Sequence, residues 1–125
     1  MSNKPTPQPR WLDAPEEHDY PAAESYLSLI YSASESANFV AALRNAECVK
    51  VKAKDVFRAS QLSLLGVSNS HVQKDQTKIA EGTAISPILL VRDKANGKVV
   101  VADGYHRLCA IYTVDEDAWI PCKIV

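Results

Sequence analysis

Apolar residues between Pro21 and Asn45 recur at three- and four-residue intervals, the spacing of one face of a helix. Proline is favoured in a first helical turn, so we expect a helix to begin near Pro21. Ser32 and Glu35 form a capping-box pattern, which predicts a second helical start. Two short helices and one kinked helix both fit this pattern. The apolar positions are Tyr26, Leu27, Ile30, Tyr31, Ala37, Val40, Ala41 and Leu43.

The pattern then changes to strict alternation over residues 49–54, where valine or alanine alternates with lysine. Successive side chains of a strand point to opposite faces, so this stretch predicts a half-buried strand with a basic outer face. A helix is predicted over residues 71–81. Ser70 and Gln73 form another capping-box pattern before it, and Gly82 is a typical helix stop after it.

Residues 85–92 form an apolar run around Pro87, short enough to be a strand buried on both faces. Asn96-Gly97 is a strong hairpin signal, and residues 98–102 are expected to return as the partner strand. A helix over 105–114 and a closing strand over 119–125 complete the pattern. The chain therefore predicts an α+β fold, with helices packed on a mixed sheet.

We expect one globular unit, because the chain has 125 residues and 46% of them are hydrophobic. Residues 1–20 are expected to be a Pro-rich tail, because five prolines lie within residues 1–21 and proline removes backbone donors. This tail is expected either to be disordered or to pack onto the domain through Trp11 and Leu12. Residues 21–48 form an N-terminal helical arm with a role in packing or in a homodimer, and residues 49–125 form the main domain.

The charge is balanced overall, with 14 Lys and Arg against 15 Asp and Glu. Nucleic acid therefore stays a partner only through a specific site, because binding by bulk positive charge is excluded. The balance hides an asymmetry: residues 1–48 carry 3 basic and 7 acidic side chains, whereas residues 49–125 carry 11 and 8. An anion site is expected in the second part.

The three cysteines, Cys48, Cys109 and Cys122, lack the tight spacing of a zinc or redox pair. Reduced thiols in a cytoplasmic protein are the simplest interpretation. The polar N-terminus is unlike a signal peptide, and no apolar run reaches the ~18 residues of a membrane span. We therefore expect a soluble cytoplasmic protein with no membrane partner.

The most informative segment turns from an apolar strand into a helix at Asp103-Gly-Tyr-His-Arg107. The first N–H groups of a helix lack intrahelical acceptors and lie at the positive end of its dipole, so such a turn favours phosphate. Asp103 is expected to cap the helix, to bind a metal or a ribose hydroxyl, or to act as a base. The expected ligand-contacting residues of the turn are Gly104, Tyr105, His106 and Arg107, although His106 and Arg107 can instead form surface salt bridges.

Two further groups of residues are candidates for anion contacts. His71, Lys74 and Lys78 share one face of the predicted helix, and this basic stripe is either a solvated face or a second wall of the site. Arg58 and Ser60 follow the basic strand, although Arg58 can equally pair with Asp55 or Asp103. We predict no metal site, because His106 and Cys109 lack a third ligand. Neither a P-loop nor a GxGxxG motif is present.

Residues 102–112 read Ala-Asp-Gly-Tyr-His-Arg-Leu-Cys-Ala-Ile-Tyr, and the chain closes with Trp-Ile-Pro-Cys-Lys-Ile-Val. With Ser-Pro-Ile-Leu-Leu-Val at 86–91, these runs resemble the ParB/sulfiredoxin superfamily over residues 49–125. The resemblance implies that His106 and Arg107 contact phosphate and that the helix carrying His71, Lys74 and Lys78 faces them. It also implies a nucleotide ligand, ATP or CTP, with Mg²⁺.

The sequence differs from members of that superfamily in two respects. Sulfiredoxins carry a reactive cysteine just before the His-Arg pair, where this chain has Tyr105, so sulfinic acid reduction is not expected. ParB partition proteins continue into a helix-turn-helix region, whereas this sequence ends at Val125. What remains resembles the stand-alone ParB-like nuclease domains.

Three hypotheses follow, and whether the chain is an enzyme stays open among them. The leading one is a nucleotide- or phosphate-binding domain that holds the anion at the Asp103–Arg107 turn. The second is a nuclease in which Asp103 and His106 are catalytic and Arg107 holds the scissile phosphate. The third is a non-catalytic interaction module with a vestigial site.

Overall fold

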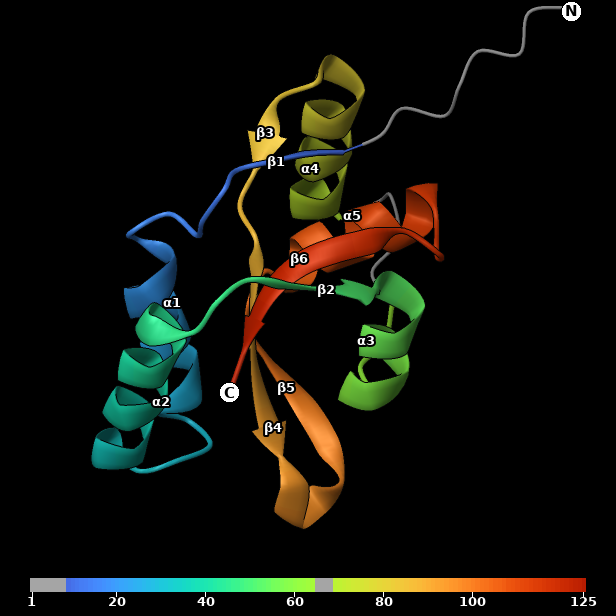
Figure 1. Ribbon diagram of the computed structural model, residues 1–125. Helices are drawn as coiled ribbons and strands as arrows, with labels where there is room; N and C mark the ends of the chain where they lie inside the picture. Colours follow the sequence, from blue (N-terminus) through green and yellow to red (C-terminus); the bar gives the residue numbers. More distant parts are fainter. Residues whose placement is uncertain (1–8, 65–68) are drawn as a thin grey trace, which may run out of the picture.

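A four-stranded mixed sheet in the order β2-β6-β4-β5 forms the centre of the fold (Figure 1). The computed structural model describes residues 9–64 and 69–125. The order of elements along the chain is β1 (Arg10–Trp11), α1 (Asp19–Leu27), α2 (Ala33–Asn45), β2 (Val49–Lys52), α3 (Ala53–Ser60), α4 (Ser70–Glu81), β3 (Ala84–Ile85), β4 (Ile88–Asp93), β5 (Lys98–Asp103), α5 (Tyr105–Val114) and β6 (Trp119–Ile124). The predicted α+β class is confirmed.

The sheet combines both strand orientations. β4 and β5 form an antiparallel hairpin, β6 runs parallel to β4, and β2 pairs antiparallel with β6. The hairpin turn is a short 3-10 segment, Lys94–Asn96, that ends at Gly97. β5 is the last strand in the order, so one of its edges has no partner strand among the described residues.

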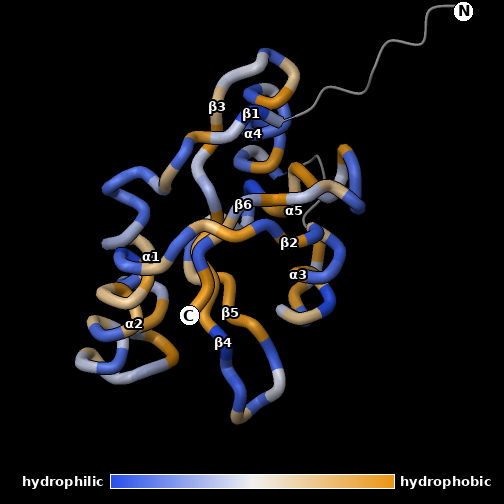
Figure 2. The backbone as a smooth tube through the Cα atoms, in the orientation of Figure 1, coloured by the Kyte–Doolittle hydropathy of each residue, from blue (hydrophilic) through white to orange (hydrophobic). Residues whose placement is uncertain are grey.

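Helices cover both faces of this sheet. Leu89 and Val91 of β4 join the core under α1 and α2, whereas Ile88 and Leu90 join the core under α3, α4 and α5. β4 is therefore buried on both faces, as its continuous apolar run predicts. Figure 2 shows hydrophobic segments of β4, β5 and β6 at the centre of the fold, with hydrophilic residues toward the hairpin turn.

The helical arm is part of this core. Leu27 and Leu43 are fully buried against β4 and β5, and Ser32 forms the predicted capping box with Glu35. The arm is two helices, because α1 ends at Leu27 and α2 begins at Ala33. Two members of the predicted apolar stripe, Tyr26 and Ile30, are 42% and 46% exposed. Ile30 lies beyond the end of α1, and Tyr26 is not among the buried positions of that helix.

The predicted strand over 49–54 is wrong at its end, because β2 stops at Lys52 and α3 follows at once. The buried positions of this helix, Ala53, Val56 and Ser60, have helical spacing. The lysine alternation runs on through Lys54 and conceals that change of period. Ser60 is one of these buried positions, and the helix therefore turns it toward the core.

Two boundaries differ from prediction for local reasons. Pro87 has no N–H to donate, and the predicted strand over 85–92 is divided there into β3 and β4. The predicted cap of α4 at Ser70 is also wrong. Asn69 is the cap, and its side-chain oxygen accepts hydrogen bonds from the N–H groups of His71 and Val72.

Part of the predicted tail is built into the structure. β1 pairs in parallel with β3, and Trp11 packs against the main core. The N–H of Leu12 donates to the carbonyl of Ile85, and α1 begins at Asp19, two residues before Pro21. Tertiary pairing therefore orders residues whose proline content predicts a tail; residues 1–8 lie outside the described part.

None of the helices in the described ranges is both long and apolar enough to cross a membrane. The three cysteines form no disulfide: Cys48 is exposed and Cys122 is buried, with burial raising the pKa of the Cys122 thiol to about 11. At that pKa the Cys122 thiol stays protonated at neutral pH and is unreactive.

Candidate functional site

Gly104 makes the turn from β5 into α5 possible. Its φ of 103° lies in the left-handed region, where side chains are disfavoured. A Cβ at this position would lie 2.8 Å from Nη2 of Arg107 and 3.0 Å from Cγ1 of Ile88. The glycine therefore serves two purposes, the backbone turn and the close approach of the Arg107 guanidinium.

The start of α5 has no side-chain cap. Gly104 occupies the cap position, whereas α2 and α4 are capped by Ser32 and Asn69. The prediction that Asp103 caps α5 is wrong, because its carboxylate binds Arg107 instead. Within the described part of the chain, no side chain of the cap residue accepts from the first N–H groups of α5, which lie at the positive end of the helix dipole.

A pocket of about 380 Å³ lies beside this turn. Its walls are the α5 turn, one face of α4, and His18 just before α1. The structure brings together eight residues that the sequence proposed for the site. They are His71, Lys74, Lys78, Asp103, Gly104, Tyr105, His106 and Arg107.

The α4 wall of the pocket carries two lysines. Lys74 and Lys78 line the pocket, and neither forms an ion pair within 9–64 and 69–125. Asp75 is the one carboxylate that α4 adds to the lining. Because α4 contributes two cations and one anion, its face leaves a net positive charge over the pocket.

Two histidines meet across the pocket. The ring centroids of His71 on α4 and His106 on α5 are 4.8 Å apart, with the planes inclined by 38°. Burial lowers the pKa of His106, and the nearby His71 and Arg107 lower it further against the opposing effect of Asp75. His106 is therefore neutral at physiological pH in the free protein, and an anion in the pocket would favour its protonation.

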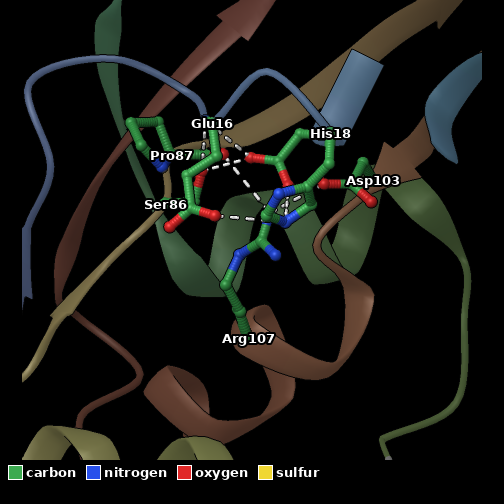
Figure 3. Close-up of polar contacts among 7 residues, drawn as sticks. Glu16, His18, Ser86, Pro87, Asp103 and Arg107 are labelled. Carbon is green, nitrogen blue, oxygen red and sulfur yellow. Dashed lines mark hydrogen bonds and ion pairs between the residues drawn. The ribbon is translucent and has the colours of Figure 1, made fainter. Parts of the chain in front are cut away.

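Arg107 is held inside the protein. Its Nη2 lies 2.9 Å from Oδ2 of Asp103, and each side chain of the pair is only 17% exposed. Nη2 also donates to the carbonyl of Pro87 at 3.4 Å, whereas Nε has no hydrogen-bond partner among residues 9–64 and 69–125. Figure 3 shows the guanidinium of Arg107 extending from α5 toward Pro87 and Asp103.

The surroundings of the Asp103 carboxylate shift its pKa in opposite directions. Burial raises its pKa, Arg107 acts against that rise, and the neighbouring Asp19 adds to it. The pKa of Asp103 is raised overall, because the Arg107 guanidinium compensates only part of the cost of burying the charge. Asp103 is thus part of a buried charge network.

The N-terminal segment completes this network. Oδ2 of Asp19 accepts hydrogen bonds from the N–H of Glu16, at 3.0 Å, and from the hydroxyl of Ser86. Nε2 of His18 lies 3.1 Å from Oε2 of Glu16 and 3.4 Å from Oδ1 of Asp19 (Figure 3). These contacts place His18 at the pocket, although no sequence pattern singled out residues 16–19.

Arg58 and Ser60 do not reach the pocket. Arg58 is 85% exposed and lies 3.9 Å from Asp55, the carboxylate named as an alternative partner. The Ser60 hydroxyl donates to the carbonyl of Phe57 within α3. Both residues belong to the helix that the alternating pattern concealed, and the fold therefore places them away from the turn.

Asp75 also went unpredicted. It lies four residues after His71 on the same helix, so the helical spacing that grouped the basic residues could have identified it. Within the described ranges, no three His, Cys, Asp or Glu side chains form a group that would hold a metal ion.

Comparison with known proteins returned no matching family model, no matching curated protein and no matching solved structure. The functional conclusion consequently depends on the geometry and chemistry of the pocket.

Proposed function

We propose that this chain binds a nucleotide or another phosphate-bearing ligand, with the phosphate at the Asp103–Arg107 turn. The observation that carries the proposal is a convergence on one pocket of about 380 Å³. Two histidines meet there with two lysines that form no ion pair with a described residue and with a helix start that has glycine at its cap position. Each feature alone is common on protein surfaces. Their convergence from α4 and α5 supplies charge, directed donors and enclosure together.

The donors are complementary in kind. The first N–H groups of α5 are directed by the helix, whereas Lys74 and Lys78 are flexible point charges that can follow a phosphate chain. His106 adds a proton-dependent donor next to them. This combination favours a ligand with more than one anionic oxygen, such as a di- or triphosphate.

The resemblance to the ParB/sulfiredoxin superfamily supports the same ligand class, ATP or CTP with Mg²⁺. Mg²⁺ in such sites is usually held by one or two carboxylates and by the ligand's own phosphates. Asp75 and Asp103 line the pocket and fit that requirement, with Asp103 already engaged by Arg107. When bound, Mg²⁺ would neutralise phosphate charge.

Calorimetric titration with ATP, CTP, GTP and inorganic phosphate, with and without Mg²⁺, tests the proposal. We expect at least one nucleotide to bind, and Lys74→Ala/Lys78→Ala to weaken that binding about tenfold or more. Charge-assisted hydrogen bonds contribute about 1.5–3 kcal/mol each, so the loss of two lysines has a measurable effect.

A matched control is Lys50→Ala/Lys94→Ala, which removes two exposed lysines that lie outside the pocket. This control should bind like the unchanged chain. The absence of binding by all four ligands contradicts the proposal, and so does equal weakening by the two double variants, which would indicate a general charge effect.

Phosphodiester cleavage is the second candidate function, favoured by the lowered pKa of His106 beside the pocket. A neutral imidazole is able to accept a proton at physiological pH. We expect metal-dependent cleavage of DNA or RNA to be lost in His106→Ala and in Asp103→Ala if the chain is a nuclease. Cleavage that survives both changes would indicate a contaminant.

A further inference from the structure

A second pocket, of about 410 Å³, adjoins the basic pocket. The two pockets share the lining residues Asp103, Gly104, Tyr105 and His106. The turn proposed to hold phosphate is therefore the boundary between two cavities, and a ligand at the turn has access to both.

The lining of the second pocket is apolar. Beyond the shared turn it consists of Ala22 and Tyr26 from α1, Val101 and Ala102 from β5, and Leu62 just after α3. It lies where helices from the two layers meet at β5, the last strand of the sheet. An occupant here would bury hydrocarbon and ring surface, in contrast to an occupant of the charged pocket.

Two large side chains of this pocket are partly exposed. Tyr26 is 42% exposed and Leu62 is 41% exposed. Tyr105 continues the aromatic surface toward the phosphate site, because its ring centroid is 5.9 Å from that of His106. Aromatic side chains thus extend from the apolar pocket to the basic one, and flat rings pack well on such surfaces.

We infer that the apolar pocket receives an aromatic ring carried by the phosphate-bearing ligand, which makes the ligand class an aryl or nucleobase phosphate. This inference rests on the proposed function, because the phosphate fixes the ligand at the shared turn. Inorganic phosphate and polar sugar phosphates fill only the basic half. A ligand with both parts gains from burial of Tyr26, Leu62 and its own ring.

Calorimetric titrations with inorganic phosphate, glycerol phosphate, phenyl phosphate and the monophosphates AMP and CMP test the inference. We expect phenyl phosphate or a nucleoside monophosphate to bind about tenfold more tightly than glycerol phosphate, in proportion to the apolar area buried. A preference for AMP or CMP over phenyl phosphate identifies a nucleobase as the ring, and the reverse order identifies a simple aryl group.

Leu62→Ser and Tyr26→Ala change the apolar pocket alone. Each should reduce the advantage of the ring-bearing phosphate to less than about threefold and leave the affinity for inorganic phosphate unchanged. Leu29→Ser is the matched control, because Leu29 is 83% exposed and lies outside both pockets. The control should retain the full advantage.

The outcomes separate the two proposals. Equal affinity for glycerol phosphate and for the ring-bearing phosphates overturns this inference and leaves phosphate binding intact. An advantage that persists in both Leu62→Ser and Tyr26→Ala also overturns it. No binding by any of these phosphates, nor by the di- and triphosphates, contradicts the proposed function, and the inference falls with it.

Discussion

The two walls of the basic pocket carry positive charge in different states. On the α5 wall, Arg107 is buried and bound to Asp103 at 2.9 Å. On the α4 wall, Lys74 and Lys78 line the pocket without an ion pair to any described residue. The positive charge of Arg107 is therefore used in an internal ion pair, whereas the charges of Lys74 and Lys78 are available to a ligand.

The charge nearest the turn is therefore not the one most available to a ligand. Arg107 orients the turn, because its guanidinium packs against Gly104 and holds Asp103. Lys74 and Lys78, in contrast, form no ion pair with a described residue and can move toward a phosphate. Changes on the α5 wall should therefore affect stability, and changes on the α4 wall should affect binding.

The largest expected effect is that of Arg107→Ala. Removal of one partner leaves Asp103 as an uncompensated buried carboxylate, which costs about 3 kcal/mol of unfolding free energy. Arg58→Ala, which removes an exposed arginine 3.9 Å from its carboxylate, should cost less than ~0.5 kcal/mol. Urea unfolding of the two variants checks this, and equal losses would remove the distinction between buried and exposed pairs.

Gly104→Ala comes next. The left-handed φ costs about 1–2 kcal/mol for a residue with a side chain, and the new Cβ would lie 2.8 Å from Nη2 of Arg107. We expect lower stability together with weaker phosphate binding, because the guanidinium and the turn must shift. Gly97→Ala, also at positive φ but with nothing within 4 Å of its Cβ, isolates the backbone contribution. Binding loss equal to that of Gly97→Ala would contradict the role of the close approach.

The pKa of His106 provides a further test, because His106 lies where the α5 wall meets His71 of the α4 wall. Burial lowers the pKa of the free imidazole below its usual 6.5, so the neutral form is the stable one at pH 7. The His106 contribution to stability is therefore present above pH 6.5 and is lost as the pH falls through the folded pKa. A bound phosphate favours the imidazolium, so the pKa should rise on binding. Titration of the imidazole resonances by NMR, assigned with His106→Gln, measures both values; no rise with ligand present would place the anion elsewhere.

The smallest expected effect on stability is that of Lys74→Ala/Lys78→Ala. These side chains have no ion-pair partner among the described residues, so their loss should change the unfolding free energy by less than ~0.5 kcal/mol. Thermal unfolding of the ligand-free variant checks this. A loss of several kcal/mol would show that the α4 wall is also structural.

Helices that are marked by nearby residues, such as a capping box or a glycine turn, were predicted from the sequence. α5 coincides with its predicted range, and the capping box of Ser32 and Glu35 is formed. α3 was missed because the lysine alternation of β2 continues into its first turn. Eight residues of the pocket were predicted, since helical spacing and the glycine turn determine which side chains α4 and α5 present.

The rest of the site depends on contacts between distant parts of the chain. The Asp19–Ser86 hydrogen bond joins residues 67 apart, and no spacing rule relates them. That contact holds Asp19 beside the pocket, and His18 with it, whereas the order of residues 10–12 comes from their pairing with residues 84–85. The apolar pocket likewise needs α1, α3 and β5 to meet, which only the assembled fold determines.

The proposed phosphate lies at the start of α5. A titration of the ¹⁵N-labelled chain with ATP or CTP, followed by backbone amide resonances, tests it most directly. We predict that the amides of Tyr105, His106 and Arg107 shift together with one saturable dissociation constant, and that Lys74→Ala/Lys78→Ala weakens this response. Saturable shifts confined to other parts of the chain, with these three amides unmoved, would contradict it.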